Sequence, residues 1–121
     1  MEKSILIIGT QGSGKTTKAR EIANKFKEDE VTWLFYNEKV NSFLQKLSEK
    51  TRLIIFEGVY DIRELKQLAN KLEDSIKINA KEGNQFTISP KYILTCQQEI
   101  LEEQLRELGS IFYERFEIIK C

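Results

Sequence analysis

Histidine is absent from this sequence, and proline and cysteine are scarce. Of its 121 residues none is histidine, one is proline and two are cysteine. Without histidine the chain holds neither a histidine-ligated metal nor a histidine general base, which excludes nuclease chemistry built on paired histidines. Cys96 and Cys121 lack metal-site spacing. The apolar run around Cys96 predicts a buried, inert thiol, and Cys121 is expected to be a loose terminal thiol.

A charge excess and long apolar runs are also missing. Lys plus Arg and Asp plus Glu both number 19, so no global field draws the chain to nucleic acid or membrane. The apolar run before Gly9 is too short for a signal peptide, and no run approaches the ~20 residues that span a bilayer. We expect a protein that is not secreted and has no membrane partner, cytoplasmic or, if from a virus of eukaryotes, nuclear.

The apolar pattern predicts one α/β domain over residues 1–121. Short apolar runs alternate with segments of helical spacing, which is typical of a parallel sheet covered by helices on both faces. The expected fold is a three-layer α/β/α sandwich with a five-stranded sheet. Its predicted strands are 4–8, 31–36, 53–57, 92–96 and 116–119, with helices at 15–27, about 40–47, 61–72 and about 97–108. A β-hairpin over 76–88, turning at KEGN, is expected as an insertion.

A glycine-rich segment directly after the first predicted strand carries the main functional signal. GTQGSGKT, residues 9–16, matches G-x-x-x-x-G-K-T, the Walker A pattern of nucleoside triphosphate binding, in the strand–turn–helix setting that the pattern requires. Lys15 is expected to reach the β- and γ-phosphates and Thr16 to hold Mg²⁺. The predicted binding residues for ATP are Gly9, Thr10, Gln11, Gly12, Ser13, Gly14, Lys15, Thr16 and Thr17.

A second candidate site residue, Glu57, follows the apolar run LIIF. Ligands of open α/β sheets bind at the carboxyl ends of the strands, which places this carboxylate beside the predicted loop. We expect Glu57 to lie near Mg²⁺ and to polarise the attacking water. A solvent-facing glutamate at a strand end is the other interpretation.

Beyond the loop, the chain resembles the superfamily 3 helicases, the ATPase domains of replication (Rep) proteins of single-stranded DNA viruses and related plasmids. The resemblance is ordered and covers nearly the whole chain. It rests on GTQGSGKT (9–16), VTWLFYNEKVNSF (31–43), LIIFEG (53–58), SIKINAKEGNQFTISPKYILTCQ (75–97) and YERFEII (113–119). It implies a P-loop NTPase core of the ASCE, AAA+-like kind.

The resemblance also implies roles for residues outside the loop. Lys81 matches a hairpin lysine that contacts single-stranded DNA, and Lys77 adds a second positive charge nearby. Gln97 takes the place of an asparagine that senses the γ-phosphate, and Arg115 matches an arginine finger supplied to a neighbouring subunit. These roles imply self-association into a ring or filament. Each of the three matched residues could instead be an ordinary surface or helix-start residue.

Two departures from the pattern keep other functions open. Motif B of the resembled family has two adjacent acids, whereas Glu57 stands alone. No origin-nicking endonuclease is present, so a separate nicking protein is an expected partner.

A small nucleotide kinase shares the first loop and helix, but only five arginines are available to clamp two sets of phosphates. A non-hydrolysing, nucleotide-dependent binding module is the third interpretation.

Overall fold

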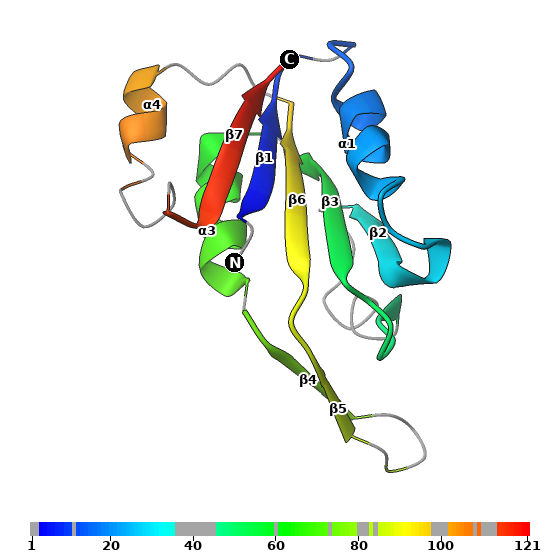
Figure 1. Ribbon diagram of the computed structural model, residues 1–121. Coiled ribbons are helices and arrows are strands. Elements are labelled where there is room, and N and C mark those ends of the chain that lie inside the picture. The colour runs from blue at the N-terminus through cyan, green and yellow to red at the C-terminus, as the bar shows by residue number, and fades with distance from the viewer. Residues whose placement is uncertain are drawn as a thin grey trace.

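The structure, a computed structural model, describes residues 3–10, 12–35, 46–59, 61–72, 74–79, 83, 85–97, 102–107, 109 and 114–121. Its core is one five-stranded parallel sheet, which confirms the predicted α/β class (Figure 1). The strands are β1 (Ser4–Ile8), β2 (Val31–Phe35), β3 (Leu53–Val59), β6 (Lys91–Cys96) and β7 (Phe116–Lys120), in the order β2-β3-β6-β1-β7.

Strand β6 lies between β1 and β3, although it follows both in the chain. It pairs with β1 from Ile5 opposite Ile93 to Ile8 opposite Cys96, and with β3 from Leu53 opposite Lys91 onward. Since all strands are parallel, the carboxyl ends of β1, β3 and β6 meet at one edge of the sheet. Residues far apart in sequence therefore share that edge.

Alternation along the strands divides the core between two faces. One buried cluster joins the sheet to helix α1 (Lys15–Ala23), and the other joins it to helix α3 (Ile62–Lys71). Ile5 and Ile7 belong to the first cluster, with Ala19 and Ala23 of α1. The second includes Leu6, Ile8, Ile54, Leu65, Leu68 and Ala69. Burial on both faces accounts for the unbroken apolar runs of β1 and β3.

The helices differ in extent from the sequence-based expectation. Helix α1 ends at Ala23 rather than near Lys27, because the chain turns there to enter a short 3₁₀ helix, Glu28–Glu30. Helix α3 begins as predicted: Asp61 is its N-cap, and its carboxylate accepts from the Glu64 N–H at 2.9 Å. Helix α4 is described only over Glu102–Glu107. Most of the predicted helix at 40–47 lies outside the described residues.

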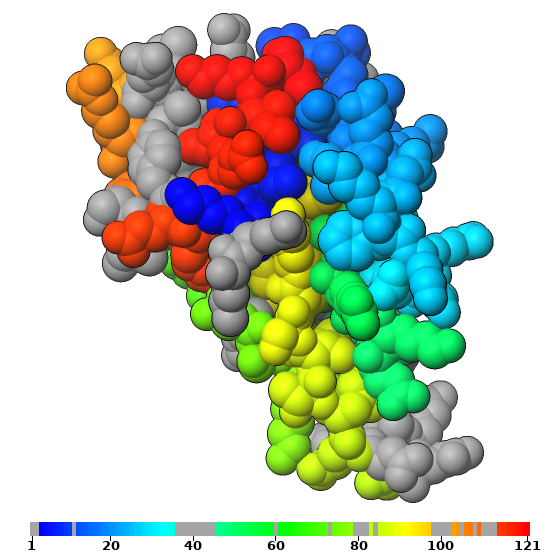
Figure 2. Space-filling view, viewed as in Figure 1, coloured from blue at the N-terminus to red at the C-terminus, as the bar shows by residue number. Residues whose placement is uncertain are grey.

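The hairpin predicted at 76–88 forms a separate two-stranded antiparallel sheet. Its strands are β4 (Ile76–Asn79) and β5 (Gln85–Ile88), and Ile76 is opposite Ile88. It projects from the amino end of the large sheet, away from the edge where β1, β3 and β6 end (Figures 1 and 2). Lys77 is exposed on it.

In the part of the chain that the structure describes, no helix has the length and apolarity needed to cross a membrane.

Candidate nucleotide-binding site

The glycine-rich loop connects β1 directly to α1. Gly12 and Gly14 have φ values of +83° and +92°, in the left-handed region that glycine adopts without strain. Gly14 is the residue preceding α1, and the Ser13 N–H donates to the Thr10 carbonyl at 3.1 Å to close a turn. The Gly9 N–H donates to the Cys96 carbonyl at 3.3 Å, which fixes the start of the loop to β6. Gln11 lies outside the described residues.

Lys15 lies over this loop although it belongs to the first turn of α1. Its residue exposure is 8%, and its ammonium donates to the Thr10 carbonyl at 2.8 Å. Within the described chain this ammonium has no carboxylate partner. A buried cation compensated only by a neutral carbonyl is suited to a polyanionic ligand.

Thr16 and Glu57 meet at the carboxyl edge of the sheet. The Thr16 hydroxyl donates to a Glu57 carboxylate oxygen, so the contact joins residues 41 positions apart. Glu57 is half-buried near the end of β3, and the helix start places Thr16 above it. A hydroxyl and a carboxylate are oxygen ligands of the kind Mg²⁺ takes when it binds through one carboxylate and substrate phosphates. The oxygen atoms of Thr16 and Glu57, together with the Lys15 ammonium, are therefore the chemical groups that a complex of magnesium and a nucleotide needs. Among the described residues, no cluster of three or more His, Cys, Asp or Glu side chains could hold a metal by itself.

A pocket of about 370 Å³ lies between the loop and the ends of β3 and β6. Its volume is within the range of small-molecule sites. Its lining comprises Gly12, Gly14, Lys15, Thr16, Thr17, Glu57, Gly58, Thr95 and Gln97. The structure thus brings together most of the predicted loop residues with Glu57 and Gln97, while Thr10 is exposed beside them.

Two lining residues, Gly58 and Thr95, were missed by sequence reasoning. The Gly58 N–H donates to the Thr95 hydroxyl at 3.2 Å, and Gly58 has φ +91° where the pairing of β3 with β6 becomes irregular. Strand β3 continues past this irregularity to Val59, two residues beyond its expected end. The Gln97 N–H donates to the Val59 carbonyl at 2.9 Å. The signal available in the sequence was a lone threonine in the apolar run YILTC.

One buried polar atom in the loop lacks a partner. The Ser13 hydroxyl is inaccessible and makes no hydrogen bond within the structure. A Cβ added at Gly9 would collide with this hydroxyl, so the two residues are closely packed. Buried hydroxyls are normally satisfied, and a phosphate oxygen is a suitable acceptor for this one.

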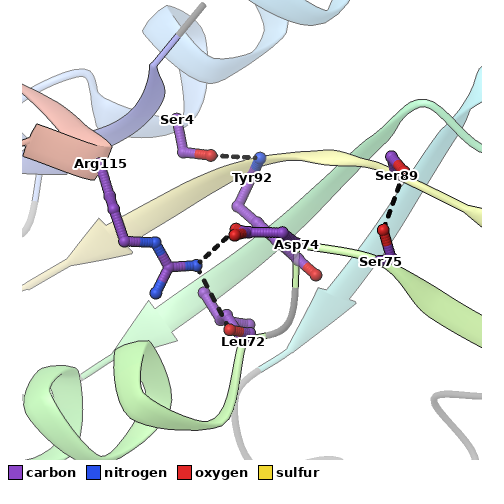
Figure 3. A network of polar contacts seen from close by, with 7 residues as sticks. All are labelled: Ser4, Leu72, Asp74, Ser75, Ser89, Tyr92 and Arg115. Carbon is purple, nitrogen blue, oxygen red and sulfur yellow. Dashed lines mark hydrogen bonds and ion pairs between the residues drawn. The ribbon is translucent and has the colours of Figure 1, made fainter. Parts of the chain in front are cut away.

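The remaining predicted site residues lie elsewhere. Arg115 precedes β7, and since Ser4 is opposite Phe116, it lies at the amino end of the sheet, away from the loop of its own chain. Its guanidinium donates to the Leu72 carbonyl at 3.3 Å and pairs with Asp74 at 3.2 Å (Figure 3). Lys77 is on the hairpin, also at the amino end, and Lys81 lies outside the described residues.

Comparison with protein families identifies one family for the chain. A family described as "Novel STAND NTPase 3" matches residues 1–121. The chain belongs to this NTPase family. The match therefore supports a nucleotide-related function of the NTPase type. No curated protein sequence matches it.

Among solved structures, the chain is similar in fold to the C-terminal region of NrS-1, determined in an apo A form. The TM-score is 0.59 at 15% sequence identity, over 98% of this chain. The chain spans 29% of the length of that structure's chain. At this identity the likeness concerns the fold.

Proposed function

We propose that this domain binds Mg²⁺·ATP in the loop pocket and hydrolyses it. The observation that carries the proposal is the contact of Thr16 with Glu57 beside the buried ammonium of Lys15. It places a positive charge and two metal-type oxygen ligands on one 370 Å³ pocket. The position of β6 between β1 and β3 supports assigning the fold to the three-layer ASCE type of P-loop ATPase.

Each residue has a role that follows from its position. Lys15 neutralises charge on the β- and γ-phosphates, and the loop N–H groups and the start of α1 hold the phosphate chain. Thr16 and Glu57 would hold Mg²⁺, which would supply positive charge to the phosphate oxygens. The exposed side chain of Gln97, at the end of β6, orients water or the γ-phosphate. One Glu57 oxygen meets Thr16 on the metal side, and the other would accept a hydrogen bond from the attacking water.

The test measures ATP binding and phosphate release on the same preparations. Lys15→Ala is expected to abolish both, because it removes the pocket's buried cation. Glu57→Gln is expected to lower phosphate release at least ~100-fold with ATP binding retained, since general-base effects are typically of this size or larger. Glu49→Gln is the matched control, because Glu49 is an exposed turn residue that precedes the amino end of β3 and does not line the pocket.

Full phosphate release by Glu57→Gln would refute the catalytic role of this carboxylate. ATP binding without turnover in the unsubstituted protein would instead favour the nucleotide-dependent binding module. Failure of ATP to bind at all would overturn the proposal.

A second candidate function is a superfamily 3-type motor that acts on single-stranded DNA as a ring or filament. The projecting β4–β5 hairpin with its exposed Lys77 favours it, since such an element could enter a channel formed by several copies. Strand β6 follows the hairpin in the chain and ends at Cys96, between the pocket residues Thr95 and Gln97, so it connects the two ends of the sheet. Arg115 would complete the pocket of a neighbouring copy, and Lys81 would contact the strand.

The motor proposal predicts that ATP turnover per subunit rises with protein concentration and with single-stranded DNA. Lys77→Gln should weaken DNA binding and reduce its salt dependence, because each lost phosphate contact lowers the slope. Turnover independent of both variables would exclude shared sites and the motor function, while leaving hydrolysis by single subunits intact.

A further inference from the structure

A second pocket adjoins the loop pocket and is not used by the proposed hydrolysis. It has a volume of about 370 Å³ and lies between α1 and the carboxyl ends of β2 and β3. The two pockets share Thr16 and Glu57, so they meet where Mg²⁺ and the γ-phosphate are expected. Apart from Ala23, the side chains that line only this pocket are two aromatic rings, a guanidinium and an amide: Trp33, Phe35, Arg20 and Asn24.

The regular geometry of one helix and one strand assembles this lining. Thr16, Arg20 and Asn24 follow each other at four-residue intervals, which places them along one side of α1 and its end. Trp33 and Phe35 alternate with the core residue Leu34, so both project to the α1 face of the sheet. Phe35 is opposite Glu57 in the β2–β3 register, which sets an aromatic ring beside the shared carboxylate.

The exposed parts of these side chains are accessible to a ligand in the pocket. Phe35 is 57% exposed and is the large apolar side chain left exposed among the described residues. Arg20 is exposed and has no ion pair with any other described side chain. Trp33 is half-buried, with its inner part packed against the α1 cluster.

These groups match the parts of one nucleotide. Aromatic side chains provide a surface on which a nucleobase stacks, and a free guanidinium pairs with a phosphate. The Asn24 amide supplies both a donor and an acceptor for a base edge or a sugar hydroxyl. The volume suits a single small molecule rather than a run of polynucleotide.

We propose that this second pocket binds a nucleoside monophosphate beside the γ-phosphate end of the bound triphosphate. The base stacks on Phe35 and Trp33, and the phosphate pairs with Arg20. Placement beside the γ-phosphate rests on the proposed function, since it assumes that ATP occupies the loop pocket. Binding of the monophosphate in the second pocket uses Arg20, Trp33 and Phe35, which lie outside the glycine-rich loop.

The sequence provides a direct probe, because Trp33 is the one tryptophan in the chain. The experiment follows its fluorescence while AMP, GMP, CMP and UMP are titrated separately, with and without saturating Mg²⁺·ATP. ATP binding is measured in parallel by calorimetry. At least one monophosphate is expected to give a saturable fluorescence change in both conditions.

Two substitutions and a control test the assignment. Arg20→Gln and Phe35→Ala are each expected to raise the monophosphate Kd roughly tenfold, the effect of losing one phosphate pair or one stacking surface. Lys18→Gln removes another α1 cation, which is partly exposed and paired with Glu21. Because Lys18 does not line the pocket, this change should leave the Kd unchanged. Lys15→Ala should abolish ATP binding and preserve the response to the monophosphate.

Three results would overturn the proposal. The first is the absence of a saturable response to every monophosphate in protein that binds ATP. The second is a response that Arg20→Gln and Phe35→Ala leave unchanged. The third is a response to a ten-residue oligothymidylate alone, which would assign the pocket to single-stranded DNA. Loss of ATP binding in the unsubstituted protein, with the monophosphate response kept, would overturn the proposed function and the placement beside the γ-phosphate, while supporting the second pocket.

Discussion

Substitution of Arg115 separates a structural role from a catalytic one. In this structure its guanidinium donates to the carbonyl of Leu72, the C-cap residue of α3, and pairs with Asp74. The carbonyls of a last helical turn lack intrahelical partners, and a cation there is favourable. Arg115 therefore connects the end of α3, the root of the hairpin and the start of β7 (Figure 3). Its side chain also lies 5.9 Å from the Phe116 ring centroid.

The expected stability change follows from exposure. The Asp74 side chain is 88% exposed, so its ion pair contributes at most about 1 kcal/mol, and Asp74→Ala should cost no more than that. The Arg115 side chain is 33% exposed and also loses the charge-assisted bond to Leu72 and the ring contact. Arg115→Ala should therefore lower the free energy of unfolding by about 1–3 kcal/mol.

Urea unfolding and ATP turnover, measured on both variants under conditions where each is folded, provide the assay. An arginine finger predicts that Arg115→Ala lowers turnover per subunit by roughly 1,000-fold or more, while Asp74→Ala leaves it unchanged. A structural role alone predicts that both variants keep normal turnover once folded. A stability loss from Asp74→Ala equal to or larger than that from Arg115→Ala would refute the reasoning about the helix end.

Three further predictions concern other residues. Leu65→Ala should lower the free energy of unfolding by about 2–5 kcal/mol in a denaturant titration, because Leu65 is fully buried in the α3 cluster; a loss under 1 kcal/mol would contradict that packing. Asp61→Ala should cost about 1 kcal/mol in the same titration through loss of the α3 N-cap, with Asp61→Asn, which keeps a capping oxygen, near the unsubstituted value. Ser13→Ala should leave stability unchanged or slightly raised, because it removes a buried hydroxyl without a partner, yet it should weaken ATP binding measured by calorimetry; unchanged affinity would show that phosphate does not use this hydroxyl.

Much of the fold could be predicted because burial on both faces of a sheet leaves a direct pattern in the sequence. The run ILII predicted β1, and the alternation of IKI and FTI predicted the hairpin. Asp61 and Glu64 marked the start of α3 through local backbone hydrogen bonding. Helix ends were less accurate: the chain leaves α1 at Ala23 to reach β2, and periodicity does not record where a connection must turn.

The sequence by itself determined the glycine-rich loop, because its glycine torsions and the lysine that follows depend on local spacing. Only the tertiary structure decided which residues face that loop. The insertion of β6 between β1 and β3 sets Thr95 beside Gly58, and β3 sets Glu57 under Thr16. The strand order also places Arg115 at the amino end of the sheet, away from the loop. The packing of α1 on the sheet brings Arg20 and Phe35 into the lining of the same second pocket. Such pairings depend on strand order and helix packing, which bring distant segments together and leave no spacing in the sequence to be read.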